Sequence, residues 1–457
     1  MPAQSYIRKN LSLAWPLALN ALLMQSMLMI DTLLVSPLGE IPLASMGIAT
    51  TVVAFILGIQ MALANGTQLV LSRAVGSGKA ESVSKAYYAG MIINLSVAAL
   101  FWVLLTLFEQ PLLLAITDNT SLHSEISHYL DISKYLVIYT AITQVMTALF
   151  NSLGRTKVPF KGYLLEMPFN AALSYALIHG VNLSSTWHFA GMGVQGAALG
   201  SIAAITLRLL FLSWCLRKDE TVILQWQSDW SAMRTNIRLH FIEIFPVAAN
   251  VTILSIGATI YQLLYSQLNI NAYVAITLVW PWFRAGTQFI TAWAHSSAIS
   301  ISQAIGSRKM DTLAKDIDTS IDVAVGISIA CSVAFFGLSL VIEDIYPVMD
   351  PATYQALAVI APLYIFTPII RGYNTVHGHV LRALGKTTAV FKINFTGQWV
   401  ISIPLCALIV LVFDGSVFWA FAIQPFEELV KALPFRQLAR KAVKEFNQEK
   451  ADKLMYD

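Results

Sequence analysis

Long apolar runs are the feature that most constrains how this chain folds. Runs of about twenty residues recur along the whole sequence, and each can cross roughly 30 Å of hydrocarbon at about 1.5 Å per helical residue. Only 12% of the 457 residues are charged, against about 25% in an ordinary soluble domain. We therefore predict an all-α polytopic membrane protein.

Twelve transmembrane helices are predicted, and the basic residues set their orientation. The six predicted outer loops contain no Lys or Arg, whereas the inner loops and the C-terminal tail are basic, as the positive-inside rule requires. We expect the protein to lie in the plasma membrane (the inner membrane of a bacterium), with both termini in the cytoplasm. The predicted spans are 11–37, 43–71, 88–110, 129–152, 159–181, 191–215, 239–265, 271–300, 320–342, 355–380, 387–412 and 415–437.

An internal repeat organises the chain into two halves. The segment from Ser72 to Glu81 recurs, after a shift of 230 residues, as the segment from Ser302 to Asp311. Pro16 and Pro246 are related by the same shift. We predict an N-lobe (1–216), a cytoplasmic linker (217–236) and a C-lobe (237–457). Because six spans is an even number, the lobes insert with the same orientation, related by a pseudo-two-fold axis along the membrane normal.

The motifs of other functional classes are absent or incomplete. The segment Gly76-Ser-Gly-Lys79 resembles a phosphate-binding loop, but its leading glycine position is Arg73, and Ala80 stands where Ser or Thr is needed. Neither the His-Glu-x-x-His nor the Gly-x-Ser-x-Gly motif occurs. We expect no enzyme activity, no cofactor, no metal site and no nucleic-acid partner.

The order and spacing of several short motifs resemble the multidrug and toxic compound extrusion (MATE) transporters. They are Pro16 in the first span, the turn at Gly76, Gly154-Arg-Thr after the fourth span, the fifth-span segment 170–174 and the glycine-rich segment 193–201. The pattern of Asp31 and Asn170 is most similar to the DinF-like branch. The resemblance implies an antiporter that expels amphipathic, often cationic compounds in exchange for protons or sodium ions.

Asp31 lies within the first apolar span, where an aspartate is costly. Placing Asp at the centre of an isolated spanning helix costs roughly 2.5–3.5 kcal/mol on insertion scales, so Asp31 should face a bundle interior or a wet cavity. Low dielectric disfavours its charged form, which suits a residue that binds and releases a proton. The alternative is a buried aspartate that only bonds neighbouring helices.

The fifth span offers partners for Asp31. Glu166, Asn170 and Ser174 recur at helical spacing, which places them on one face. In the similar branch an aspartate often stands at the position of Ser174, so a second carboxylate is missing here. Ser201 matches a family hydroxyl position, and Tyr139 is the tyrosine of the fourth span with the most plausible depth. Each of these residues could instead make an ordinary interhelical hydrogen bond. We expect Glu166 to pair with Lys161; the alternative is a way station for a proton that leaves inward.

Pro16 is the predicted hinge of the first helix. Proline removes one backbone hydrogen bond and clashes with the preceding turn, so a bend there is inexpensive; the alternative is a static kink. We predict that the substrate cavity is lined by soft and polar side chains of the first two spans, because Met-rich surfaces repack around varied apolar ligands. Its candidate residues are Asn20, Met24, Met27 and Met61.

Two transport alternatives stay open at this stage. Sodium is the alternative coupling ion, although carboxylates are absent from the interiors of the seventh and tenth spans. A lipid-linked precursor flippase of the same superfamily has the same two-half plan. Arg284 and Arg371 would either pair with a carboxylate such as Glu427 or attract anionic groups. We expect amphipathic drugs and the lipid bilayer as partners, and a monomeric protein.

Overall fold

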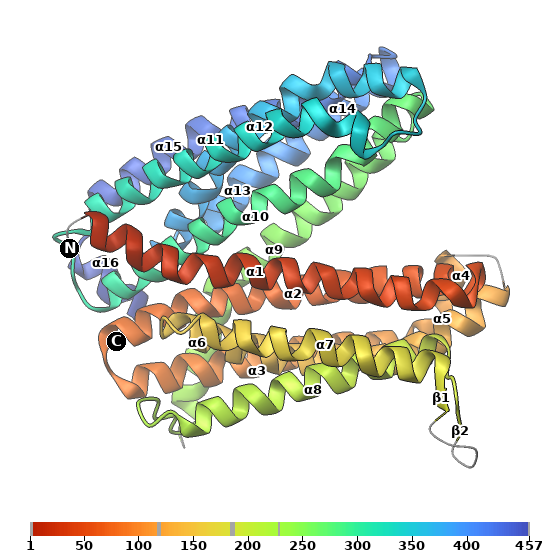
Figure 1. The fold of residues 1–457 in the computed structure, drawn as a ribbon. Coiled ribbons are helices and arrows are strands. Elements are labelled where there is room, and N and C mark those ends of the chain that lie inside the picture. The colour runs from red at the N-terminus through yellow and green to blue at the C-terminus, as the bar shows by residue number, and fades with distance from the viewer. Residues whose placement is uncertain (1–2, 117–119, 183–187, 227–228, 456–457) are drawn as a thin grey trace. The chain divides into compact units, whose positions relative to one another are not determined.

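The computed structural model describes residues 3–116, 120–182, 188–226 and 229–455 (Figure 1). Within these residues, each of the twelve predicted spans lies mostly in helical structure, although a turn at residues 134–135 interrupts the fourth and strand β1 ends the fifth. The strands described there form one short antiparallel hairpin, in which β1 (Gly180–Asn182) pairs with β2 (His188–Ala190). The structure is thus almost entirely α-helical, as the sequence predicts.

The chain packs into two compact units, each with its own internal contacts. One unit comprises residues 19–245, and the other comprises residues 1–18 together with 246–457. The helices of the first are the latter part of α1 (Ala3–Val35), η1 (Ser36–Leu38), α2 (Glu40–Ser77), α3 (Ala80–Leu107), α4 (Glu109–Ile116), α5 (Thr120–Ser133), α6 (Leu136–Ser152), α7 (Lys157–His179), α8 (Val194–Lys218) and the start of α9 (Trp230–Tyr265).

We call the second unit, residues 1–18 and 246–457, the C-unit. It contains most of the C-terminal half. Near its C-terminal end, two π-helical segments, η2 and η3, interrupt the helix that starts with α13. Its elements are the start of α1, the rest of α9, α10 (Ile270–Gly306), α11 (Leu313–Ile345), α12 (Pro351–Ala383), α13 (Thr387–Phe395), η2 (Thr396–Ser402), α14 (Ile403–Ala407), η3 (Leu408–Val412), α15 (Val417–Glu445) and α16 (Gln448–Met455).

The boundaries of the units differ from those of the predicted lobes. The first 18 residues pack with the C-terminal half, and residues 217–245 pack with the N-terminal half. Two long helices, α1 and α9, therefore each contribute to both units. The changes of unit fall after Ala18 and before Pro246, close to the two prolines that the repeat relates. We call the unit of residues 19–245 the N-unit.

Corresponding turns of the two halves have the same backbone conformation. Gly154 and Gly385 follow α6 and α12, and both have φ = 76°, a left-handed conformation that favours glycine. In each turn the next amide donates to a carbonyl five residues earlier, at 2.8 Å. The repeat predicted from short sequence motifs therefore includes the backbone conformation and the hydrogen bonding of these two turns.

Local sequence signals explain where several C-unit helices begin. The side chain of Asn269 accepts from the amide of Ala272 at the start of α10, and that of Asp350 accepts from the amide of Ala352 at the start of α12. Such caps satisfy amide groups that the first helical turn leaves unpaired. Pro351 follows its cap at the first helical position, where a missing N–H costs nothing.

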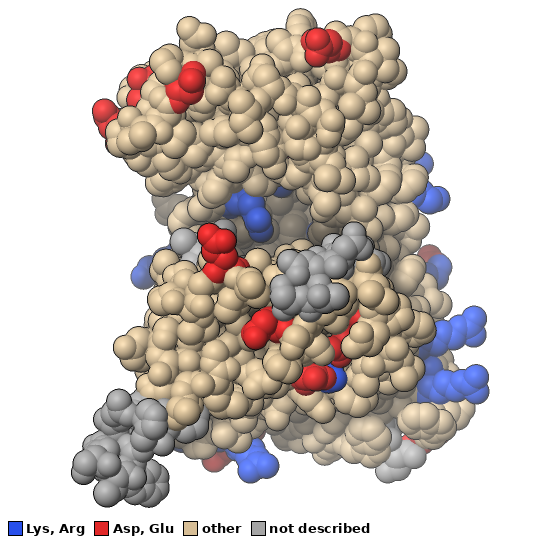
Figure 2. All heavy atoms as spheres, turned by 90° about the vertical axis from the view of Figure 1, so that its right-hand side faces the viewer, with Lys and Arg blue, Asp and Glu red and all other residues tan. Residues whose placement is uncertain are grey.

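Eight helices in the described residues are long and apolar enough to cross a membrane, judged by length and composition. The other four predicted spans lie in α1, α7, α10 and α15, which have between 23 and 37 residues. Figure 2 looks onto the helix ends that lie opposite the chain termini of Figure 1. In that view both acidic groups and some Lys or Arg side chains interrupt a mostly uncharged surface.

Candidate functional site

Asp31 is buried in the N-unit, with only 8% of its surface exposed. Each of its carboxylate oxygens accepts a hydrogen bond from a different helix. Asn170 of α7 donates from Nδ2 to Oδ1 at 2.9 Å, and Ser201 of α8 donates from Oγ to Oδ2 at 3.3 Å. The side chain thereby joins α1 to both α7 and α8.

The orientation of Asn170 is fixed at both ends of its amide. While Nδ2 donates to Asp31, Oδ1 accepts from the hydroxyl of Ser174 at 3.3 Å. Both α7 residues are almost fully buried. Four of the five residues predicted for proton or cation coupling, Asp31, Asn170, Ser174 and Ser201, therefore form one connected cluster, which we call the Asp31 cluster.

A glycine of α8 lets the two helices of the cluster approach each other. A Cβ atom at Gly200 would overlap Ser174 Oγ and lie 3.0 Å from Ser174 Cα. Gly200 directly precedes Ser201. The residue that allows α8 to approach α7 is therefore next to the serine whose hydroxyl donates to Asp31. Small residues at helix interfaces of membrane proteins allow such close contact.

Apolar side chains lie beside the Asp31 cluster. Val35, one turn after Asp31, packs in a buried group with Tyr129, Leu130 and Ala198. In such surroundings a polar group is stable only when its hydrogen-bonding capacity is used. The carboxylate of Asp31 meets this condition with one partner on each oxygen.

Tyr139, the fifth predicted coupling residue, is not brought to Asp31. It is half-buried on α6, where its backbone carbonyl accepts from the hydroxyl of Thr143 at 3.0 Å and its backbone amide donates to the carbonyl of Tyr135 at 3.3 Å. The prediction of Tyr139 rested on its depth in the fourth span. Tyr129, the first residue of that predicted span, is the tyrosine that packs beside Val35.

Glu166 pairs with Arg208 of α8, at 2.8 Å, and not with Lys161 as expected. The guanidinium lies 4.2 Å from the ring centroid of Tyr163 and donates to Thr143 at 3.1 Å. Lys161 is exposed, on a different face of α7. The sequence did contain a signal for Arg208, since it follows Ser201 by seven residues and so lies on the same face of α8.

The predicted hinge and cavity residues occupy different environments along α1 and α2. Pro16 is buried inside α1, two residues before the chain passes from the C-unit to the N-unit. Asn20 is also buried, and its Oδ1 atom has no hydrogen-bond partner among the described residues. Met27 is half-buried, and Met24 and Met61 are exposed. None of these residues lines the pocket described next.

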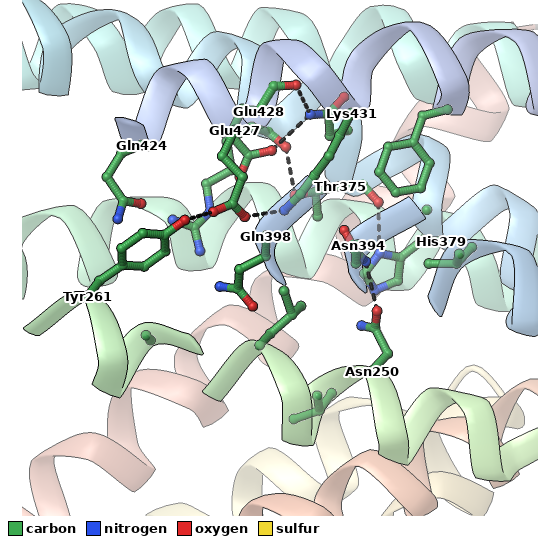
Figure 3. A pocket seen from close by; sticks show the side chains of 18 of the residues that line it. Asn250, Tyr261, Thr375, His379, Asn394, Gln398, Gln424, Glu427, Glu428 and Lys431 are labelled. Atoms are coloured by element: carbon green, nitrogen blue, oxygen red, sulfur yellow. Dashed lines mark hydrogen bonds and ion pairs between the residues drawn. The ribbon is translucent and has the colours of Figure 1, made fainter. Parts of the chain in front are cut away.

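A pocket of about 310 Å³ lies within the C-unit, where the sequence analysis placed no substrate site (Figure 3). Tyr261, the counterpart of Asp31 under the 230-residue shift, donates to Glu427 at 2.5 Å. Lys431 also pairs with Glu427, one turn away on α15. Asn374 of α12 donates to the carboxylate of Glu428 at 2.8 Å. In the described part of the chain, no group of three or more His, Cys, Asp or Glu side chains could hold a metal ion.

A protein-family model, MatE, matches this chain twice, over residues 16–176 and 246–408. The chain belongs to the MATE family. The two matches begin at Pro16 and Pro246, which confirms the 230-residue repeat. Members of the family are membrane transporters and not enzymes, as the sequence predicts.

Individual relatives are distant but cover most of this MATE chain. A "probable multidrug resistance protein NorM" of Rhizobium meliloti is 24% identical over 393 residues, which is 82% of each chain. The crystal structure of an aspartate-to-asparagine mutant of the Vibrio cholerae MATE transporter VcmN aligns with a TM-score of 0.86 and 18% identity, over 100% of this chain and 99% of that one. VcmN in its bent form gives a TM-score of 0.84 at 18% identity, over 97% and 99%.

These matches confirm the predicted fold class and the multi-pass membrane character of this MATE transporter. They do not distinguish branches within the family, so the DinF-like assignment stays a prediction.

Proposed function

We propose that this MATE transporter exports amphipathic, mainly cationic compounds in exchange for protons, with Asp31 as the proton-carrying residue. The proposal is supported by relatives named multidrug resistance proteins in Rhizobium meliloti and Burkholderia vietnamiensis. The observation that carries it is the buried carboxyl group of Asp31, held between Asn170 and Ser201.

The two oxygens of Asp31 differ in how they can accommodate a proton. The amide nitrogen of Asn170 can only donate, so Oδ1 must remain an acceptor while that bond exists. The hydroxyl of Ser201 can donate or accept. Protonation at Oδ2 therefore requires only that the hydroxyl of Ser201 rotate and accept, and the Asp31 cluster can exist in two charge states.

The same geometry favours a proton over a sodium ion. Hard cations are held by several oxygen ligands, whereas Asn170 turns its nitrogen toward Asp31 and uses its oxygen to accept from Ser174. A proton needs only one carboxyl group. Sodium binding would require the amide of Asn170 to reverse and the bond from Ser174 to break.

Protonation of Asp31 is proposed to bend α1 near Pro16 and so to release substrate. Asp31 lies in the part of α1 that packs in the N-unit, and Pro16 lies in the part that packs in the C-unit. Proline weakens the helix two residues before the chain passes from one part to the other. A change in the bonds from Asp31 to α7 and α8 can therefore be absorbed as a bend in α1.

The proposed orientation places both termini in the cytoplasm of a bacterial cell, with the transporter in the inner membrane. It rests on the absence of Lys and Arg from the predicted outer loops. Under this orientation Asp31 lies in the outer half of α1, since it is near the helix end opposite to the N-terminus. It is therefore placed to take up protons from outside.

The experiment is efflux of a lipophilic cation such as tetraphenylphosphonium from proteoliposomes. We expect efflux to follow an imposed pH gradient for the wild-type protein and to fall to the level of protein-free vesicles for Asp31→Asn. Asp344→Asn, which neutralises an exposed aspartate at the end of α11, is the matched control and should retain efflux. Efflux that follows a sodium gradient alone would refute proton coupling.

A further inference from the structure

The C-unit pocket contains polar atoms that have no partner in the described residues. They belong to three buried amide side chains and one arginine, which come from three different elements: Asn250 Nδ2 of α9, Asn374 Oδ1 and Arg382 Nε of α12, and Gln398 Oε1 of η2. Buried polar groups in proteins are nearly always hydrogen-bonded. Four such atoms belong to residues that line one cavity, and polar groups of a molecule in that cavity could supply their missing partners.

The size of the pocket suits a small-molecule ligand. Its volume of about 310 Å³ lies at the lower end of the roughly 300–1,000 Å³ that small-molecule sites occupy. Figure 3 shows Tyr261 and Glu427 pointing toward one another, with Gln398 below Glu427 in this view and Asn250 directed at Asn394. Gln398 lies on the π-helical segment η2, and such segments occur frequently at functional sites.

The charges of the pocket favour an anion. Its lining includes two carboxylates, Glu427 and Glu428, and three cationic side chains, Arg371, Arg382 and Lys431. Lys431 and Glu427 neutralise each other as an ion pair. The remaining lining charges are those of Glu428, Arg371 and Arg382, so the formal balance is positive.

Arg371 is the cation best placed to hold a ligand. Its guanidinium lies over the ring of Phe283, 5.3 Å from the ring centroid. In the described part of the chain it pairs with no carboxylate, because Glu427 and Glu428 are engaged by Tyr261, Lys431 and Asn374. The edge of a guanidinium offers paired donors that match a carboxylate or a phosphate.

We propose that the C-unit pocket binds the carboxylate group of an amphipathic small molecule through Arg371. The amide groups of Asn250 and Gln398 supply further hydrogen bonds, and Trp280 and Tyr265 supply an apolar wall for the rest of the molecule. This site differs from the Asp31 cluster in charge and in location. The proposal concerns equilibrium binding and does not depend on proton coupling.

Isothermal titration calorimetry on the purified transporter tests the proposal with a matched pair of probes. We expect 1-naphthaleneacetate to bind and its uncharged amide, 1-naphthaleneacetamide, to bind about tenfold more weakly or not at all, since a charge-assisted bond is lost. This comparison needs no variant. Equal binding of the two probes would overturn the proposal.

Two arginine variants locate the site. Arg371→Gln should weaken binding of 1-naphthaleneacetate by about tenfold, whereas Arg284→Gln, which removes the same charge from an exposed position of α10 outside the pocket, should not change it. Inorganic phosphate should compete poorly, because it has no apolar part. Equal effects of the two variants, or full competition by phosphate, would contradict a pocket that recognises an amphipathic carboxylate.

Discussion

Ser174 and Ser201 provide two hydroxyl groups at different distances from the same carboxyl group. Ser201 donates to Asp31 itself, whereas Ser174 donates to Asn170 and reaches Asp31 only through that amide. If protonation of Asp31 depends on reversal of the Ser201 hydroxyl, the two serines must contribute unequally to transport.

Replacing each serine with alanine tests this difference. We expect Ser201→Ala to slow pH-driven efflux by about two- to tenfold, the equivalent of one ordinary hydrogen bond. Ser174→Ala should have a smaller effect, since it leaves both bonds to Asp31 intact. The initial rate of efflux from proteoliposomes measures both. Equal loss in the two variants would mean that Ser201 has no special place in proton exchange.

Arg208 and Glu166 form a buried ion pair, and Glu166 lies one helical turn before Asn170 of the Asp31 cluster. Removing one partner of such a pair leaves an uncompensated charge and typically costs about 3–5 kcal/mol. We therefore expect Arg208→Gln to lower the melting temperature of the detergent-purified protein. The double variant Glu166→Gln/Arg208→Gln should recover much of the loss, because no lone charge remains. A melting temperature unchanged in the single variant would contradict the pairing.

At the residue scale, sequence periodicity predicted some contacts of the site and not others. Asn170 and Ser174 were found because one helical face repeats every three to four residues. Arg208 lies on the same face of α8 as Ser201, but spacing along α7 contains no information on which residue of α8 meets Glu166. The choice of Tyr139 rested on depth alone, which does not fix the direction of a side chain.

Close packing of α7 against α8 is the feature of the N-unit on which the Asp31 cluster depends. Both helices carry cluster residues, and Gly200 removes the side chain that would separate them. Any widening of this contact would move Ser201 away from Asp31, so the same substitution should affect both stability and transport.

Gly200→Ala tests the packing of these two helices. A Cβ atom there would overlap Ser174, and overpacking typically costs about 1–3 kcal/mol. We expect a lower melting temperature and slower efflux. Gly47→Ala is the control, because a Cβ atom at that position of α2 would have no atom within 4 Å and alanine favours helix. Similar melting temperatures in the two variants would argue against a tight contact between α7 and α8.

On the scale of the whole molecule, α1 and α9 each pass from one unit to the other near a proline. The sequence predicted two repeated halves, because short motifs survive in both. It did not predict that the first 18 residues pack with the C-terminal half. That arrangement depends on contacts between residues hundreds of positions apart, such as the bond of Tyr6 to Ser320 at 2.7 Å.

Pro16→Ala tests whether α1 must bend during transport. Alanine restores the missing backbone donor and removes the clash with the preceding turn, which straightens and stiffens a helix. We expect drug resistance in cells to fall to the level of an empty vector while the amount of protein in the membrane is unchanged. Pro434→Ala, at an exposed position of α15, is the control. Normal resistance in Pro16→Ala would mean that the proline is a static kink.

Proton release on substrate binding is the most direct test of the central claim that Asp31 exchanges a proton for substrate. Tetraphenylphosphonium is added to the purified protein in a weakly buffered solution that contains a pH indicator. We predict that the wild-type protein and Asp344→Asn release protons into the solution and that Asp31→Asn releases none although it still binds the cation. Equal proton release from Asp31→Asn and the wild-type protein would contradict the account.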